Sequence, residues 1–488
     1  MNGPPTSPSH PRRGTTWRLA ALVGLLGLMF PAVAQAHAVV AREDLPLPTW
    51  LFFWGGALVL IVSFAALSQA WQEPRLATAG GRTLPGGLSS AVGSTAARVL
   101  GGVVGVALLA LTIYAGLSGV DSPAQNFAVT FVFVTFWLGV PVFSVLFGNV
   151  FRALNPWRAV GNLAEAGSRA LAGGRVPPPL LYPDWLGRWP AALGLFGFLW
   201  FELVYTGDNV SPSDVAGAAV LYTIVTVVAM AAFGTERWMN GGETFATYFR
   251  MLSFLSPLGF RDGRLRFRVP LSGMGDWMQA PGSVALVLVA IGGTAYDGAT
   301  EGPLAQPIND TFRALFEAGF ADVLALRITG TIFLLLSIGA IAAIYWIGVR
   351  GMRTVDDSKP LATLGRAFAH SLIPIALAYL VAHYFTLFLF QEQAQFTYLL
   401  SDPLGEGADI FGTAGSGIDY SIIGASTVWY VQVGALVIGH VAGLIVAHDR
   451  ALEVFGDADD ASRSQYWMLT VMVIFTTLGL YLLSQANQ

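Results

Sequence analysis

Residues 326–349 read LRITGTIFLLLSIGAIAAIYWIGV, an apolar run of 24 residues in which Arg327 is the single charged side chain. An α-helix of about 20 apolar residues crosses the roughly 30 Å hydrocarbon core of a bilayer. The run therefore predicts a membrane-spanning helix. Trp346 near its end is typical of the aromatic belt at a membrane surface.

The same pattern recurs along the whole chain. Of its 488 residues, 54% are hydrophobic and 11% are charged, against about 25% charged in an ordinary soluble domain. We therefore predict an all-α, polytopic transmembrane helical bundle of about ten helices, forming a single domain over residues 37–488. The other nine predicted spans are 47–70, 99–119, 126–148, 189–206, 214–234, 279–297, 367–391, 421–447 and 466–484.

The N-terminus has the three parts of a secretory signal. Arg12, Arg13 and Arg18 precede an apolar run over residues 19–30, which is followed by the sequence PAVAQAH. A charged region, a short apolar region and an A-x-A site predict cleavage between Ala36 and His37. We therefore expect residues 1–36 to be a signal sequence, with an uncleaved first helix as the alternative.

The distribution of basic residues predicts the orientation. With the mature N-terminus outside, the inner segments 71–98, 149–188, 235–278, 350–366 and 448–465 hold 20 Arg and Lys residues. The outer side holds three, Arg42, Arg313 and Arg327, the last of them at the outer end of its span. Cytoplasmic loops of membrane proteins carry this positive excess. We expect a bacterial cytoplasmic membrane protein with both mature ends outside and lipid as its main partner.

Composition and motifs exclude several chemistries. The chain has no cysteine, which removes disulfides, thiolate nucleophiles and cysteine-bound metal clusters. No basic domain interleaved with aromatic residues predicts nucleic-acid binding. No phosphate-binding loop, G-x-S-x-G turn or H-E-x-x-H motif is present. The glycines of residues 101–105, GGVVG, indicate close helix packing instead.

Two histidines lie toward the predicted inner face, in consecutive antiparallel spans. His370 and His440 are about equally far from the inner ends of these spans, so we expect them to face each other. Pro374 cannot donate to the carbonyl of His370, which predicts a kink and an exposed backbone acceptor beside the imidazole. Such a pair is able to ligate haem or a divalent metal. The alternative is a pair of buried, hydrogen-bonded histidines.

A second group lies toward the predicted outer face. Glu202, Asp297 and His383 reach similar depths when residues are counted from the helix ends. Ionisable residues inside spans are costly, so each one indicates function. Two carboxylates and an imidazole are able to activate water or hold a metal. The alternative is three unconnected side chains. His37, once exposed by cleavage, offers an amine and an imidazole to copper.

Several stretches resemble bacterial multi-pass membrane proteins of the fenitrothion hydrolase family. They run from residue 36 to residue 450 and so cover nearly the whole chain. The resemblance implies hydrolysis of a lipophilic organophosphorus triester with release of a nitrophenol, and it carries no catalytic residue set with it. The stretches are AHAVVAREDLPLPTWLF (36–52), FGNVFRALNPWR (147–158), SPLGFRDG (256–263), AHYF (382–385), GHVAG (439–443) and AHDR (447–450).

Three functions therefore remain open from the sequence. The first is a membrane hydrolase that uses Glu202, Asp297 and His383 on a lipophilic small molecule. The second is a haem- or copper-binding protein that uses His370 and His440, with His37. The third is a transporter with a path of kinked helices and buried acids. Partner membrane subunits are compatible with all three.

Overall fold

The computed structural model describes residues 49–172, 178–206, 210–277 and 279–486. The chain divides into two units, Met1–Pro46 and Leu47–Gln488, and everything below concerns the second. The predicted signal sequence and His37 lie outside the described residues, so both remain predictions.

The predicted bundle of membrane helices is confirmed. Among the described residues, eight helices are long and apolar enough to cross a membrane, and two shorter apolar helices cover Trp54–Ala70 and Trp189–Tyr205. Each predicted span falls on one of these ten. The helices are α2 (Thr49–Ala70), α4 (Thr95–Ser118), α5–η1–α6 (Phe127–Thr130, Phe131–Gly139, Val140–Phe147), α9–η2 (Trp189–Trp200, Phe201–Thr206), α10 (Pro212–Phe233), α13 (Ser283–Thr300), α15 (Asp322–Met352), α16–η4–α17–α18 (Leu361–Phe368, Ala369–Leu372, Ile373–Phe396, Tyr398–Ser401), α19 (Ala425–Phe455) and α20 (Ala458–Ala486).

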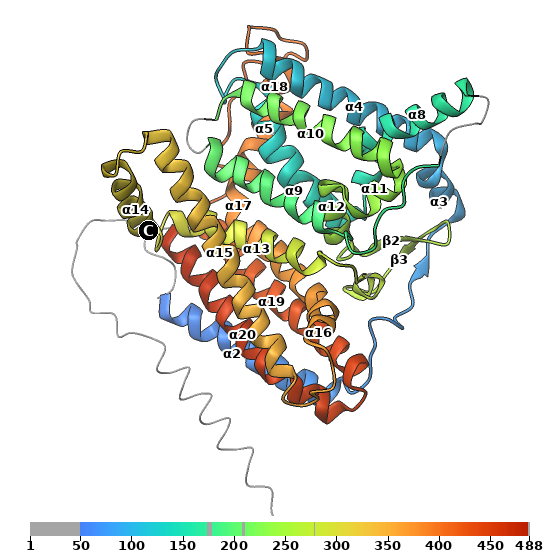
Figure 1. The fold of residues 1–488 in the computed structure, drawn as a ribbon, viewed down its shortest axis with the longest axis vertical. Helices are drawn as coiled ribbons and strands as arrows, with labels where there is room; N and C mark the ends of the chain where they lie inside the picture. The colour runs from blue at the N-terminus through green and yellow to red at the C-terminus, as the bar shows by residue number, and fades with distance from the viewer. Residues whose placement is uncertain (1–48, 173–177, 207–209, 278, 487–488) are drawn as a thin grey trace, which may run out of the picture. The chain divides into compact units, whose positions relative to one another are not determined.

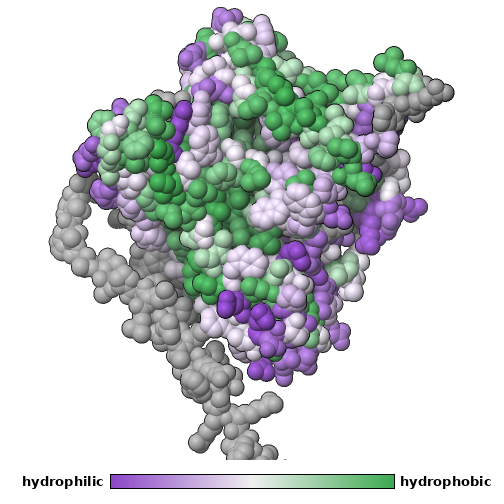
Figure 2. Space-filling model, viewed as in Figure 1, coloured by the Kyte–Doolittle hydropathy of each residue, from purple (hydrophilic) through white to green (hydrophobic). Residues whose placement is uncertain are grey.

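The helices form two groups (Figure 1). The first contains α4, α5–η1–α6, α9 and α10, with α4 packed on α10. The second contains α2, α13, α15, α17, α19 and α20, with α19 packed on both α17 and α20. The groups meet where α9 contacts α13 and where η1 contacts α17. Figure 2 shows a broad apolar area across the middle of the visible face and hydrophilic residues toward its edges, as a lipid-facing surface requires.

The connecting segments contain further structure that the apolar windows did not predict. A small antiparallel sheet of order β1-β3-β2 lies in the predicted cytoplasmic segments. Its hairpin turns at Asp262 (φ 52°) and Gly263 (φ 72°), the Asp-Gly pair that favours a two-residue turn with positive φ. The remaining elements are α3 (Gly86–Gly93), α7 (Phe151–Leu154), α8 (Pro156–Leu171), α11 (Thr235–Gly241), α12 (Thr244–Ser253), η3 (Ser272–Asp276), α14 (Ala305–Glu317), β1 (Arg82–Thr83), β2 (Leu258–Arg261) and β3 (Arg264–Phe267).

Helix α12 is almost entirely buried, although it lies in a segment predicted to be a loop. Glu243 caps it by accepting from the backbone N–H groups of Phe245 and Ala246 and from the Tyr222 hydroxyl. Burial raises the pKa of the Glu243 carboxyl. Phe245 and Phe249 then pack edge-on against Phe136. These contacts insert α12 between the spans and bring its side chains close to the candidate site.

The glycine-rich stretch of α4 is a close-packing surface, as predicted. A Cβ atom at Gly105 would lie 1.9 Å from the carbonyl oxygen of Leu154 in α7. A Cβ atom at Gly102 would lie 2.8 Å from the Cβ of Ala159 in α8. Only hydrogen atoms fit in these gaps, so α4 contacts α7 and α8 through its backbone.

Gly105→Ala is expected to destabilise the protein by about 1–3 kcal/mol, because the added methyl group forces α4 away from α7. The measurement is the thermal unfolding of the purified protein in one detergent. Gly217→Ala in α10 is the matched control, because no heavy atom lies within 4 Å of its new Cβ. Equal unfolding temperatures for the two variants would contradict the assigned α4–α7 contact.

Candidate functional site

Asp297 and His383, both predicted site residues, are in direct contact. Asp297 lies near the end of α13 and His383 lies in α17. The Nε2 atom of His383 is 2.8 Å from Oδ2 of Asp297. The Tyr384 hydroxyl donates to the same Oδ2 atom over 2.6 Å. One carboxylate oxygen therefore holds two ring side chains from the facing helix.

Consecutive positions on α17 make this arrangement. Side chains of neighbouring helical residues diverge by about 100°, so His383 and Tyr384 approach Asp297 from two sides. Their rings meet edge to face with centroids 4.5 Å apart. On α13, a Cβ atom at Gly298 would lie 3.4 Å from Nδ1 of His383. The absent side chain at Gly298 leaves space beside that nitrogen.

The contact favours one tautomer of the imidazole. An ionised Asp297 only accepts hydrogen bonds, so the proton belongs on Nε2 of His383. The lone pair is then on Nδ1, for which the described residues provide no hydrogen-bond partner. The side chains of His383 and Asp297 are 24% and 26% exposed, so the pair is not sealed inside the bundle. An imidazole oriented in this way is a base able to take a proton from water.

Glu202, the third predicted residue, lies nearby. It belongs to η2, a π-helical segment, and such irregular turns are frequent at functional sites. Its carboxylate is close enough to Asp297 and to Tyr248 of α12 to interact electrostatically. Within the described ranges, however, no three His, Asp or Glu side chains are arranged to hold a metal ion. The metal interpretation of Glu202, Asp297 and His383 is therefore not supported, whereas activation of water remains open.

The location of the site follows from the two groups of helices. η2 belongs to the first group, and α13 and α17 belong to the second. Tyr248 belongs to the buried helix α12 and stacks on Trp137 of η1, with ring centroids 5.2 Å apart. The sequence did not single out Tyr248 or Tyr384. Tyr384 had a signal in its position directly after His383, whereas Tyr248 lay in a predicted loop.

Comparison with protein-family models, with curated proteins and with solved structures finds no match for this chain. The likeness to the fenitrothion hydrolase family therefore remains an expectation from the quoted stretches of sequence. The proposed function therefore rests mainly on the geometry of the site.

The predicted His370–His440 pair does not form at one depth. Gly439, next to His440, packs at the level of Pro374 and Ala378, where its Cβ would lie 2.8 Å from the Pro374 carbonyl oxygen. His370 instead lines a pocket with Val446 and Arg450, about two turns farther along α19. Nδ1 of His440 bonds the Leu436 carbonyl over 2.7 Å, an ordinary helix contact. The paired haem or metal site is therefore not supported.

The predicted break at Pro374 is present, but it takes a different form. The helix narrows to the 3₁₀ segment η4 before α17 begins at Ile373, with Pro374 in its first turn. The backbone N–H of Ile373 donates to the His370 carbonyl. The acceptor expected to be exposed beside the imidazole is therefore already used.

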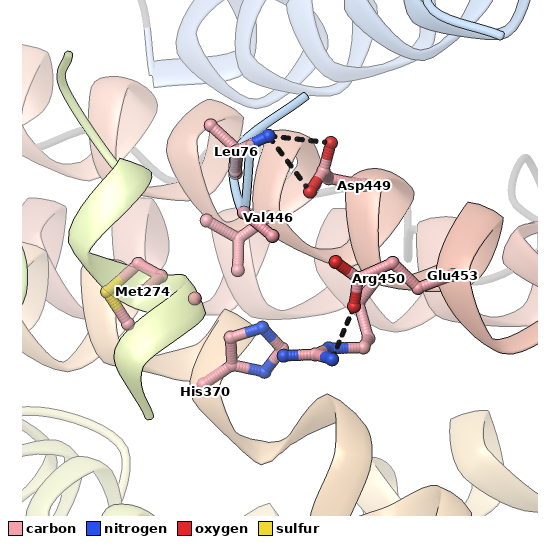
Figure 3. A pocket seen from close by; sticks show the side chains of 9 residues that line it. Leu76, Met274, His370, Val446, Asp449, Arg450 and Glu453 are labelled. Carbon is pink, nitrogen blue, oxygen red and sulfur yellow. Dashed lines mark hydrogen bonds and ion pairs between the residues drawn. The ribbon is translucent and has the colours of Figure 1, made fainter. Parts of the chain in front are cut away.

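The pocket beside His370 lies at the predicted cytoplasmic end (Figure 3). Met274, Val446, Arg450 and Glu453 surround the imidazole, and Arg450 is paired with Glu453. The His370 Nδ1 atom is buried and has no hydrogen-bond partner among the described residues. The pocket is small and partly open to solvent. The size of this pocket and its charged residues are therefore unsuitable for haem.

The acid beside this pocket has a structural role that the sequence did not reveal. Asp449 accepts from the Trp71 indole over 3.0 Å and from the backbone N–H groups of Arg75 and Leu76. His448 bonds the Trp71 carbonyl through Nε2 over 2.9 Å. The His448 side chain is thus buried. Together the two residues anchor the segment that follows α2.

Proposed function

We propose that this membrane protein hydrolyses lipophilic phosphotriesters, with His383 as the general base. The observation that carries the proposal is the bond between Nε2 of His383 and Asp297, which leaves Nδ1 as an acceptor beside Gly298. The resemblance of the sequence to fenitrothion hydrolases supports the same class of reaction.

The proposed step balances with water as the second reactant. Nδ1 of His383 takes one proton from a water molecule as its oxygen attacks phosphorus. The new P–O bond forms while the bond to the aryl oxygen breaks, and the aryloxide leaves with the electron pair. Asp297 stabilises the imidazolium that forms, and Tyr384 restrains Asp297 through its hydroxyl. His383 then releases the proton to solvent.

The location of the site suits such a substrate. Neutral aryl triesters partition into lipid, so a base between membrane helices meets them at high local concentration. A nitrophenolate is a good leaving group, so the enzyme needs only a base that activates water. The natural substrate is then an apolar ester with a good leaving group, since fenitrothion itself is man-made.

Turnover by the purified protein tests the proposal. We expect the protein in lipid nanodiscs to release 3-methyl-4-nitrophenolate from fenitrothion catalytically, as followed by absorbance. A rate equal to that of empty nanodiscs would contradict the proposal.

A transporter is the second candidate, and one observation favours it. Glu202 and Asp297 lie where the two groups of helices meet, the place where rocking motions expose a site to alternate sides. Uptake of a solute by proteoliposomes, lost in Asp297→Asn and accompanied by no ester hydrolysis, would favour this candidate over the hydrolase.

A further inference from the structure

Helix α14 (Ala305–Glu317) is held at one surface of the bundle by both of its ends. Four residues separate it from the end of α13 at Thr300, and four separate it from the start of α15 at Asp322. Both neighbours are candidate membrane spans. Such short links keep α14 at the level where the two spans leave the hydrocarbon core. Figure 1 shows it beside that end of α15.

The sequence of α14 divides into two faces. At 100° per residue, its apolar side chains fall within about a third of the circumference. Its polar side chains fall within the adjoining third, and Asp310 is the one opposite the centre of the apolar face. The apolar face is formed by Ile308, Phe312, Leu315 and Phe316, and the polar face by Gln306, Asn309, Asp310, Arg313 and Glu317.

Protein contacts cover the apolar face of α14 only in part. α14 packs on the start of α15, where Ile308, Phe312 and Leu315 are half-buried and none of its residues is fully buried. Phe316 stacks on Phe312 and remains 52% exposed. The exposed apolar surface continues through Phe320 (40%) to Val323 (58%) and Leu324 (50%) at the start of α15. The apolar face is therefore continuous with the flank of a membrane span.

We infer that α14 is an interfacial helix, with Phe316 and Phe320 inserted among lipid acyl chains and the Asp310 face in water. A helix of this kind lies in the membrane plane, with its apolar side at the boundary between headgroups and acyl chains. Lipid is the chosen occupant because the lipid-facing flank of α15 runs directly into the patch. The inference is independent of the proposed hydrolysis.

The absence of cysteine from the chain makes a clean test available. Phe316→Cys, Phe320→Cys and Asp310→Cys each introduce one thiol for a nitroxide label. The labelled proteins are reconstituted in vesicles of phosphatidylethanolamine and phosphatidylglycerol. Collision rates with oxygen, which concentrates in lipid, and with a water-soluble nickel chelate are then measured. Asp310→Cys is the control because Asp310 is exposed and lies opposite the centre of the apolar face on the same helix.

We expect the ratio of oxygen to nickel collisions to be several-fold higher at positions 316 and 320 than at position 310. Equal ratios at all three positions would place the patch in water and overturn the inference. Protection of positions 316 and 320 from both reagents would assign the patch to another protein surface, such as a second copy, and would also overturn it. Two labelled positions keep the test decisive if one variant fails to fold.

Discussion

Asp297→Asn is expected to lower kcat for triester hydrolysis by about 10²–10⁴-fold, with little change in KM. The carboxylate receives Nε2 of His383 and the Tyr384 hydroxyl on one oxygen. A neutral amide stabilises the imidazolium less, and its NH₂ group favours the tautomer with the proton on Nδ1. Steady-state kinetics of nitrophenolate release measures both constants.

Glu392→Gln is the matched control for this substitution. Glu392 is another acid within a span, on the same helix as His383, and it accepts from the Thr135 hydroxyl over 3.0 Å, away from Asp297. Its replacement should leave kcat unchanged. Wild-type kcat in a folded Asp297→Asn protein would remove Asp297 from the mechanism, and a loss confined to KM would reassign it to substrate binding.

Asp449→Ala is expected to give the largest loss of stability, about 2–4 kcal/mol, because each buried N–H left without an acceptor costs about 1–3 kcal/mol. Asp449 is 4% exposed, and it holds the Trp71 indole and two backbone N–H groups of the segment after α2. Unfolding of membrane proteins is often irreversible, so the unfolding rate at one temperature in detergent is the appropriate measurement.

Asp460→Asn is the control for Asp449→Ala. Asp460 lies in the first turn of α20 and forms a solvent-exposed ion pair with Arg463 at 3.6 Å. An exposed pair contributes about 0–1 kcal/mol, so its loss should change the unfolding rate little. If Asp449→Ala unfolds no faster than Asp460→Asn, the anchoring role of Asp449 is wrong.

The spans were predictable because lipid imposes a simple rule on sequence. A helix such as α15 has to expose apolar side chains on every side, so its composition alone reveals it. The same reasoning did not predict helix α12. It lies among basic residues, and its burial depends on the pocket formed by Phe136, Trp137 and neighbouring aromatic rings, which no local pattern encodes. The apolar residues of α14 recur with helical spacing in the sequence. This short amphipathic helix lies between two spans, however, and apolar windows do not reveal it.

The sequence predicted how deep the site residues lie in the membrane, but it did not predict which way each side chain points. Counting residues from helix ends placed Asp297 and His383 at one level, and the structure places them in contact. The same counting failed for His370 and His440. α19 continues to Phe455, eight residues beyond the predicted end of the span, which leaves His440 deeper in the bundle than expected. The 3₁₀ segment η4 also changes the direction of the His370 side chain. Apolar windows reveal neither feature.

His383→Ala with added imidazole tests the central claim most directly. The substitution removes the base and leaves a cavity beside Asp297, so free imidazole is able to occupy the position of the missing ring. The base assignment predicts a variant with little fenitrothion hydrolysis of its own and a rate that rises with the concentration of neutral imidazole. A rate that stays at the wild-type level without imidazole, or one that imidazole does not change, would contradict His383 as the base.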